Sequence, residues 1–159
     1  GHMAAAPRWE SIAWLQRQTT LPIILKGILH PQDALQAKRL GLAGVVVSNH
    51  GGRALEGSPA SLAVLPQLRA AVGDDFMLLL DGGIRRGSDV FKALALGAQA
   101  VLLGRPQAYG LGAAGALGVA QMLRLLREEL ELTMALAGCA TLADISSACL
   151  VNPNEFSSC

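Results

Sequence analysis

The fold is decided by Val45-Val46-Val47-Ser48-Asn49-His50-Gly51-Gly52-Arg53, a stretch that changes abruptly from apolar to polar. Three consecutive β-branched residues predict a short buried strand, and the polar half with its two glycines predicts a loop at the carboxyl end of that strand. The loop places an imidazole, His50, three residues before a guanidinium, Arg53. Because parallel α/β proteins carry their chemistry at the carboxyl ends of strands, we expect a functional site here.

Buried strands and helices alternate on both sides of this stretch. Strands are predicted at 21–25, 42–47, 76–80 and 100–103, and helices at 9–18, 31–40, from 61 to about 72, 89–96 and 115–137. The strands end near Lys26, His50, Asp81 and Gly104, in steps of 24, 31 and 23 residues. This spacing leaves room for a right-handed crossover after each strand, so the sequence predicts an α/β fold with about four consecutive parallel βα units.

Single residues set several of the predicted helix boundaries. We expect Pro66 in the first turn of a restarted helix, because a proline in the middle removes a hydrogen bond. We expect Ser88 to be the N-cap of the helix at 89–96. Thr141 and Asp144 have the spacing of a capping box for a small terminal helix. The helix near 115–137 has one apolar face, formed by Val119, Met122, Leu123, Leu126, Leu130 and Met134.

The composition limits the classes of function. With 159 residues the chain has the size of one domain and is shorter than a complete TIM barrel, which typically needs ~250 residues. The net charge of +1 gives no reason to expect a nucleic-acid partner, and no apolar run approaches the ~18 residues of a membrane span. The three cysteines lie late in the chain without metal-ligand spacing, which predicts reduced thiols, no metal and a cytoplasmic protein.

The two ends are set apart from the predicted domain. Gly1-His2-Met3 is interpreted as a protease scar before an original start methionine, and residues 1–6 as a tag scar and leader. Residues 152–159 show no periodicity and are predicted to be a loose tail. The predicted domain therefore covers residues 7–151.

The string Ser48-Asn49-His50-Gly51-Gly52-Arg53 resembles the signature of the FMN-dependent α-hydroxy acid oxidases and dehydrogenases, the family of glycolate oxidase and lactate oxidase. The resemblance extends from about Trp9 to Val151. The family fold is a TIM barrel of eight βα units, so the resemblance implies the C-terminal half of such a barrel. It also implies FMN as the cofactor and the oxidation of a small 2-hydroxy acid to the 2-oxo acid. A peroxisomal location is compatible with the family, although the chain does not end in Ser-Lys-Leu.

The resemblance assigns roles to four side chains near the predicted mouth. His50 would be the base that takes the proton from the substrate hydroxyl while two electrons leave the α-carbon for the flavin. Arg53 would bind the substrate carboxylate through its planar guanidinium. Lys26 would lie against the pyrimidine edge of the flavin, where a positive charge stabilises the anionic reduced form. Ser48 points toward the same mouth from the neighbouring strand end.

Two glycine-bearing loops are assigned to the phosphate side of the FMN site. Asp81-Gly82-Gly83-Ile84-Arg85 and Gly104-Arg105 both combine glycine, which exposes backbone N–H groups, with an arginine that can neutralise a phosphate dianion. The resemblance places Asp81 on the ribityl hydroxyls. Arg86 is interpreted as an exposed neighbour of Arg85, with a phosphate contact left open.

Two hypotheses of different classes follow. The first is an enzyme, the C-terminal half of an FMN-dependent 2-hydroxy acid oxidase or dehydrogenase. The second is a truncated half-barrel that folds or self-associates and at most binds FMN or phosphate, without catalysis. In the family the N-terminal half supplies a tyrosine pair and the carboxylate that orients the histidine. A half-barrel leaves two sheet edges and an apolar face uncovered, so we expect a homo-oligomer.

Overall fold

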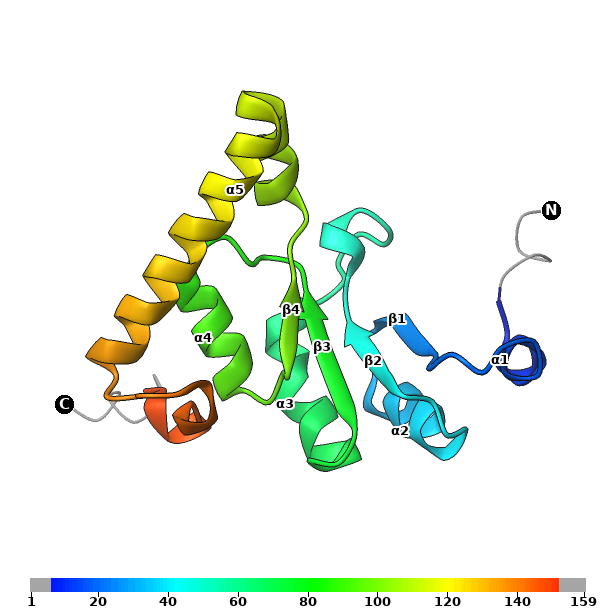
Figure 1. The fold of residues 1–159 in the computed structure, drawn as a ribbon. Helices are drawn as coiled ribbons and strands as arrows, with labels where there is room; N and C mark the ends of the chain where they lie inside the picture. Colours follow the sequence, from blue (N-terminus) through cyan, green and yellow to red (C-terminus); the bar gives the residue numbers. More distant parts are fainter. Residues whose placement is uncertain (1–6, 152–159) are drawn as a thin grey trace.

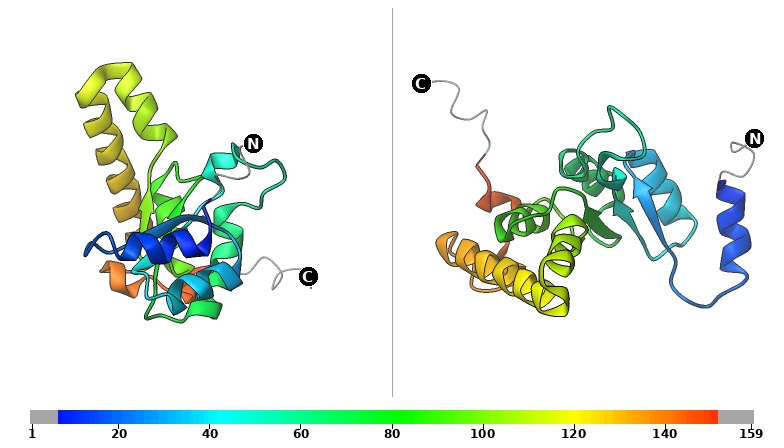
Figure 2. Two further views of the ribbon diagram at one scale, coloured as in Figure 1. Left: turned by 90° about the vertical axis from the view of Figure 1, so that its right-hand side faces the viewer. Right: turned by 90° about the horizontal axis from the view of Figure 1, so that it is seen from above.

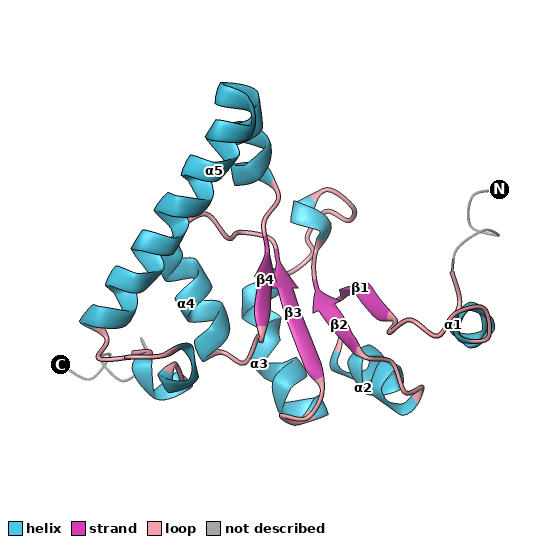
Figure 3. Ribbon diagram, in the orientation of Figure 1, coloured by secondary structure: helices cyan, strands magenta, loops and turns pink. Residues whose placement is uncertain are grey.

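The computed structural model describes residues 7–151, and these form an α/β fold (Figures 1 and 3). Residues 1–6 and 152–159, interpreted above as a leader and a loose tail, lie outside the described range. The main elements are, in chain order, α1 (Trp9–Gln16), β1 (Ile24–Ile28), α2 (Pro31–Arg39), β2 (Gly44–Val47), α3 (Ser61–Val72), β3 (Met77–Asp81), α4 (Gly87–Ala95), β4 (Ala100–Leu102) and α5 (Arg105–Leu136). Short 3₁₀ turns lie between β2 and α3, at His50–Gly52, and after α5, at Leu142–Asp144 and Ser147–Cys149.

The four strands form one parallel sheet in the order β1-β2-β3-β4, which confirms the predicted succession of βα units. Lys26 pairs with Val46, Val46 with Leu79, and Leu79 with Ala100. Consecutive strands are therefore neighbours and all four carboxyl ends lie at one edge of the sheet. This is the arrangement of half a TIM barrel.

One face of the sheet carries the core. Val45 and Val47 of β2 and Leu78 and Leu80 of β3 are completely buried, as alternate residues of a strand should be when they share a covered face. Helices α2, α3 and α4 lie on this side of the sheet (Figures 1 and 2). Burial of these apolar side chains is the main contribution to the free energy that holds the helices on the sheet.

The opposite face is apolar but uncovered. Ile24 of β1 is 38% exposed and Met77 of β3 is 39% exposed, and both share this face because they pair with Gly44 from either side. Leu102 of β4, next to Asp81, is 37% exposed. No helix of the described residues covers this side of the strands in Figure 2. In a closed barrel such positions form the interior layers.

Helix α5 consists of two segments joined at a sharp kink. Ala114 and Gly115 depart from helical geometry, with Gly115 at φ 59° and ψ −142°. The segments pack tightly behind the kink, since a Cβ on Gly118 would overlap the carbonyl oxygen of Gly110. The second segment lies along α4, where a Cβ on Gly87 would overlap the backbone at Leu130. The second segment matches the helix predicted near 115–137, whereas the first segment, from Arg105 to the kink, was not predicted; its glycines support close packing between the two segments.

Three further boundaries differ from the prediction. Strand β1 begins at Ile24 and not at residue 21, because pairing with β2 starts where Ile24 meets Gly44, so Lys26 lies inside the strand. Pro66 lies inside α3, between the completely buried Leu65 and Leu68, and their packing outweighs the lost hydrogen bond.

The N-terminus of α4 is capped by Asp89 and not by Ser88. Oδ2 of Asp89 accepts hydrogen bonds from the backbone N–H groups of Arg85 and Arg86, both at 3.0 Å. The spacing of Thr141 and Asp144 does form a cap, with the Thr141 N–H donating to Oδ2 of Asp144 at 2.6 Å.

The apolar face predicted for the helix near 115–137 packs against the rest of the structure in part. Leu126 and Leu130 lie against the main core, whereas Leu123 is 48% exposed.

Within residues 7–151, no helix is both long enough and apolar enough to cross a membrane.

Candidate active site

A cavity of about 570 Å³ opens at the carboxyl ends of the strands. Its lining contains ten of the eleven residues that the sequence selected, namely Lys26, His50, Arg53, Asp81, Gly82, Gly83, Ile84, Arg85, Gly104 and Arg105. The eleventh, Ser48, is 1% exposed and lies behind the lining. Residues spread over 80 positions of sequence thus meet because parallel strands bring their carboxyl ends to one edge.

Lys26, Ser48 and Asp81 form a polar cluster across three neighbouring strand ends. Nζ of Lys26 donates a hydrogen bond to Oγ of Ser48 at 2.9 Å and forms an ion pair with Oδ2 of Asp81. The second carboxylate oxygen, Oδ1 of Asp81, is buried without a hydrogen-bond partner among the described residues. A buried acceptor without a donor is costly, so this atom is suited to accept a hydroxyl or N–H of a ligand.

The His50 loop is held by the side chains of the two residues that precede His50. Oγ of Ser48 accepts the N–H of His50 at 3.1 Å, and Oδ1 of Asn49 accepts the N–H groups of Gly51 and Gly52 at 3.1 and 3.2 Å. His50 has φ 55°, the only positive φ of a residue other than glycine within 7–151. Such a conformation costs free energy and persists where surrounding contacts enforce it, often at functional sites.

The imidazole of His50 lies against the backbone of Gly27. A Cβ on Gly27 would sit 2.7 Å from Cε1 of His50. Gly27 has φ 97° and lies where the β1–β2 register shifts between Lys26 and Ile28, which is a bulge. Gly27 was not predicted to belong to the site, although a glycine in a strand often marks a close approach of another group to the backbone.

Asn49 is bonded to the start of α3 and also lies against Gly82 of the loop after β3. The N–H of Asn49 donates to Oγ of Ser61 at 3.1 Å, and Nδ2 of Asn49 donates to the carbonyl of Pro59 at 3.2 Å. A Cβ on Gly82 would lie 3.2 Å from Oδ1 of Asn49 and 3.3 Å from Oγ of Ser61. Asn49 and Ser61 were not singled out by the sequence, because both act through contacts with distant segments.

The loops after β3 and β4 offer backbone and cationic groups for an anion. Gly83 has φ 83° and open space where its Cβ would be, so a ligand can approach its backbone. Arg105 is the first residue of α5 and Gly104 its N-cap, so free N–H groups of a helix start lie at the cavity. The N–H of Arg85 is already used by Asp89, which leaves its guanidinium as the group available to a ligand.

The cavity has an excess of positive charge. Lys26, Arg53, Arg85 and Arg105 contribute four cations and Asp81 one carboxylate, which gives +4 − 1 = +3 without His50. Of these cations only Lys26 forms an ion pair with a described residue. Nε of Arg53 donates to the carbonyl of His50 at 3.4 Å, and the Arg105 guanidinium lies near Gly51. The cavity is therefore built for an anionic ligand.

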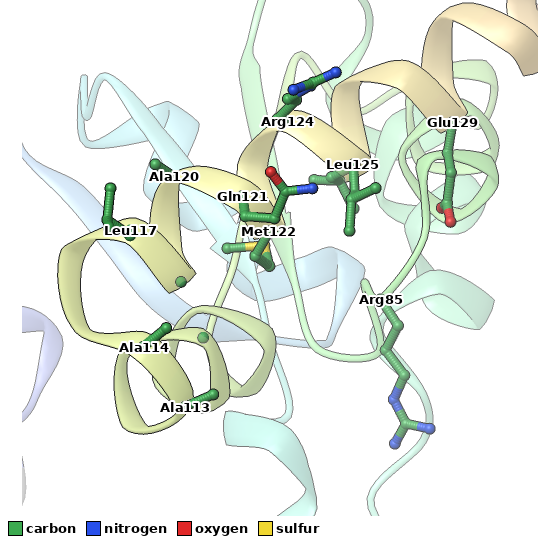
Figure 4. A pocket seen from close by; sticks show the side chains of 13 residues that line it. Arg85, Ala113, Ala114, Leu117, Ala120, Gln121, Met122, Arg124, Leu125 and Glu129 are labelled. Atoms are coloured by element: carbon green, nitrogen blue, oxygen red, sulfur yellow. The ribbon is translucent and has the colours of Figure 1, made fainter.

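A second and larger cavity lies between the two segments of α5 (Figure 4). It has a volume of about 720 Å³ and a mostly apolar lining that includes Leu117, Met122 and Leu125. Arg85 lies at its border, and in Figure 4 its side chain extends away from Glu129. Arg85 is the one residue that lines both cavities, and the other strand-end residues around His50 line only the smaller one, so we place the chemistry in the smaller cavity.

Comparison with known proteins gives one consistent result. Residues 1–152 match the family model described as FMN-dependent dehydrogenase. The chain is 60% identical over 146 residues to an L-lactate oxidase of Alicycliphilus denitrificans and 53% identical over 147 residues to a peroxisomal (S)-2-hydroxyacid oxidase of Arabidopsis thaliana. Each match covers 92% of this chain and 40% of the relative, so the chain spans about two fifths of their length.

The solved structures agree with the sequence matches. The crystal structure of a mandelate oxidase with (S)-4-hydroxymandelic acid superposes with a TM-score of 0.84 at 50% identity, over 86% of this chain and 39% of that one. The half-barrel fold is thus shown by the strand order and by this superposition.

Proposed function

The chain belongs to the FMN-dependent dehydrogenase family, and we propose that it forms the part of a 2-hydroxy acid oxidase that holds FMN and the substrate carboxylate. The reaction is the oxidation of a small 2-hydroxy acid to its 2-oxo acid. The observation that carries the proposal is the cavity at the strand ends, where a histidine, the polar cluster of Lys26, Ser48 and Asp81, and three further cations meet.

The residues present suit the chemical groups of FMN. The unpartnered Oδ1 of Asp81 can accept a ribityl hydroxyl. The phosphate can lie between the guanidinium groups of Arg85 and Arg105 at the start of α5, where helix N–H groups and the open backbone of Gly83 can bind it. These groups come from two loops, and the parallel sheet brings both to the same edge.

The substrate side of the proposal assigns one task to each side chain. FMN, when bound, supplies the acceptor for the two electrons that leave the α-carbon. A ring nitrogen of His50 takes the proton from the substrate hydroxyl, and Arg53 binds the carboxylate. Lys26 provides a positive charge beside the site and is held in place by Ser48 and Asp81.

Charge complementarity supports this assignment. A phosphate dianion and a substrate carboxylate bring about three negative charges near neutral pH, and the lining residues sum to +3. In a cavity partly shielded from water, such a match raises affinity and orients the ligands. The polarity of the site is what an anionic cofactor and an anionic substrate need together.

A second candidate function is a half-barrel that self-associates without catalysis. The exposed Ile24, Met77 and Leu102 and the two free sheet edges support it, since parallel sheets are normally buried on both faces. A homodimer that pairs β4 of each copy with β1 of the other would close eight parallel strands. A cytoplasmic location, expected from the cysteines, stays a prediction.

Anaerobic reduction separates the two candidates. Protein loaded with FMN is mixed with glycolate, lactate or mandelate in the absence of oxygen, and flavin absorbance is followed. The enzyme hypothesis predicts bleaching by at least one acid and loss of that bleaching in His50→Gln, which keeps FMN. Stable yellow protein with all three acids would leave the non-catalytic half-barrel as the function of this chain.

A further inference from the structure

Two cysteines outside the active site lie in contact with each other. The Sγ atoms of Cys139 and Cys149 are 3.6 Å apart. Cys139 follows Gly138, whose φ of 74° turns the chain at the end of α5, and Cys149 ends the last 3₁₀ turn. The chain between them folds back through Asp144, whose carbonyl lies 3.8 Å from both sulfur atoms. The reversal of the chain thus brings the two thiols together.

The two thiols differ in their surroundings. Cys139 is buried in a small apolar cluster with Phe91 and Ala95 of α4 and with Ile145, whereas Cys149 is half-buried at the edge of this cluster. A hydrogen bond from the Ser146 backbone is the main cause that lowers the pKa of the Cys149 thiol. Burial is the main cause that raises the pKa of the Cys139 thiol. The more accessible sulfur is therefore also the one that forms a thiolate more readily.

We propose that Cys139 and Cys149 are a peroxide-sensitive thiol pair that is converted to an intramolecular disulfide. The sulfur atoms need to approach by about 1.5 Å to reach the length of an S–S bond. The pair lies in one packed cluster and its connecting loop is short, so the approach requires no rearrangement of the sheet.

The reaction balances with hydrogen peroxide as the only oxidant. The Cys149 thiolate attacks one peroxide oxygen, the O–O bond breaks, and the departing hydroxide takes up a proton to become water. The Cys139 sulfur then attacks the sulfenic sulfur of Cys149, the S–S bond forms, and the S–O bond breaks to release a second water. Two thiols and one peroxide give one disulfide and two waters. The proposal does not depend on the proposed function, although an oxidase that uses dioxygen would produce this oxidant itself.

The disulfide would link the turn Ser147–Cys149 to the segment that follows α5, and both the turn and α5 pack on α4. The turn Ser147–Cys149 contacts α4, and α4 begins directly after Arg85 and Arg86 of the anion-binding loop. A covalent link at Cys139 would fix this turn to the end of α5, which also packs on α4. We therefore expect oxidation to stabilise the packing around α4.

Mass spectrometry of a variant with two thiols tests the proposal. Cys159 lies outside the described residues and is replaced in Cys159→Ser, so that only the pair remains. The protein is treated with hydrogen peroxide, blocked with N-ethylmaleimide, and cut before Asp144, which separates Cys139 from Cys149. The proposal predicts loss of both alkylation sites, a mass lower by two hydrogen atoms, and a linked peptide that reductant separates.

Two further variants, each with one cysteine of the pair removed in the Cys159→Ser background, distinguish disulfide formation from independent oxidation of the two thiols. In Cys159→Ser/Cys139→Ala, oxidation should stop at a sulfenic acid on Cys149 that dimedone traps. In Cys159→Ser/Cys149→Ala, Cys139 should oxidise at least ~10-fold more slowly than the pair does, because it is buried and protonated. The Tm of the protein with the disulfide should be about 5 °C higher than the Tm of the reduced protein. Thiols that stay fully alkylated, a link only between two molecules, or a sulfinic acid on Cys149 without a linked peptide would overturn the proposal.

Discussion

The imidazole of His50 lies directly against Gly27, with its Cε1 atom 2.7 Å from the position that a Cβ on Gly27 would occupy. The contact joins the bulged end of β1 to the loop after β2. Because His50 also has a positive φ, both its backbone and its side chain are fixed by neighbours. The base of the proposed reaction is therefore positioned within this half of the barrel.

Gly27→Ala tests this contact. The new methyl group overlaps the imidazole and also has to adopt φ 97°, so we expect a destabilisation of about 1–2 kcal/mol together with a displaced ring. Gly57→Ala is the matched control, since Gly57 has φ 77° and open space around the Cβ position. Urea unfolding should show a similar backbone cost in both variants. Only Gly27→Ala should change the His50 ring signals in an NMR spectrum, and unchanged signals would refute the positioning role.

The Lys26–Asp81 ion pair should be energetically coupled. We expect Lys26→Met to destabilise the fold by about 1 kcal/mol, because it leaves the Asp81 carboxylate facing the interior without its cation, while partial exposure of Lys26 limits the loss. In Lys26→Met/Asp81→Asn part of this loss should be recovered. Urea unfolding of the single and double variants gives the coupling energy. If the changes in unfolding free energy of the two single variants simply add in the double variant, the two side chains are not energetically coupled.

The uncovered sheet face should drive self-association. Met77→Glu places a charge on this face beside Ile24, so it should shift the sedimentation profile toward the monomer. Leu136→Glu is the control, because Leu136 is equally apolar and lies 82% exposed at the end of α5, away from the sheet. If the unaltered chain sediments as a compact monomer at high concentration, the expected homo-oligomer is excluded.

The sequence predicted those parts of the fold that depend on local pattern. The apolar runs around Val45–Val47 and Leu78–Leu80 identified strands, and the polar residues after them identified the edge that forms the cavity. This worked because a parallel sheet brings every carboxyl strand end to the same edge, so neighbours in space can be inferred from position alone.

What the sequence could not give were contacts between distant segments. Gly27 had no predicted role and Gly82 only a predicted role in ligand binding, because their close contacts with His50 and Asn49 arise only in the fold. The first segment of α5 was missed for the same reason, since its glycines lower helix propensity and are used for the Gly110–Gly118 contact. Strand β1 was placed too early because its register is set by Gly44 of β2.

In the proposed function, the cavity at the strand ends holds FMN through its phosphate. A titration of FMN, followed by fluorescence, with the unaltered chain, Arg85→Ala and Arg86→Ala measures this binding. Arg86 is the matched control because it is the exposed neighbour of Arg85 and does not line the cavity. We predict saturable binding that Arg85→Ala weakens at least ~10-fold and Arg86→Ala leaves within about twofold, since a charge-assisted hydrogen bond contributes about 1.5–3 kcal/mol. Equal affinities for all three proteins, or no binding to any, would contradict the claim.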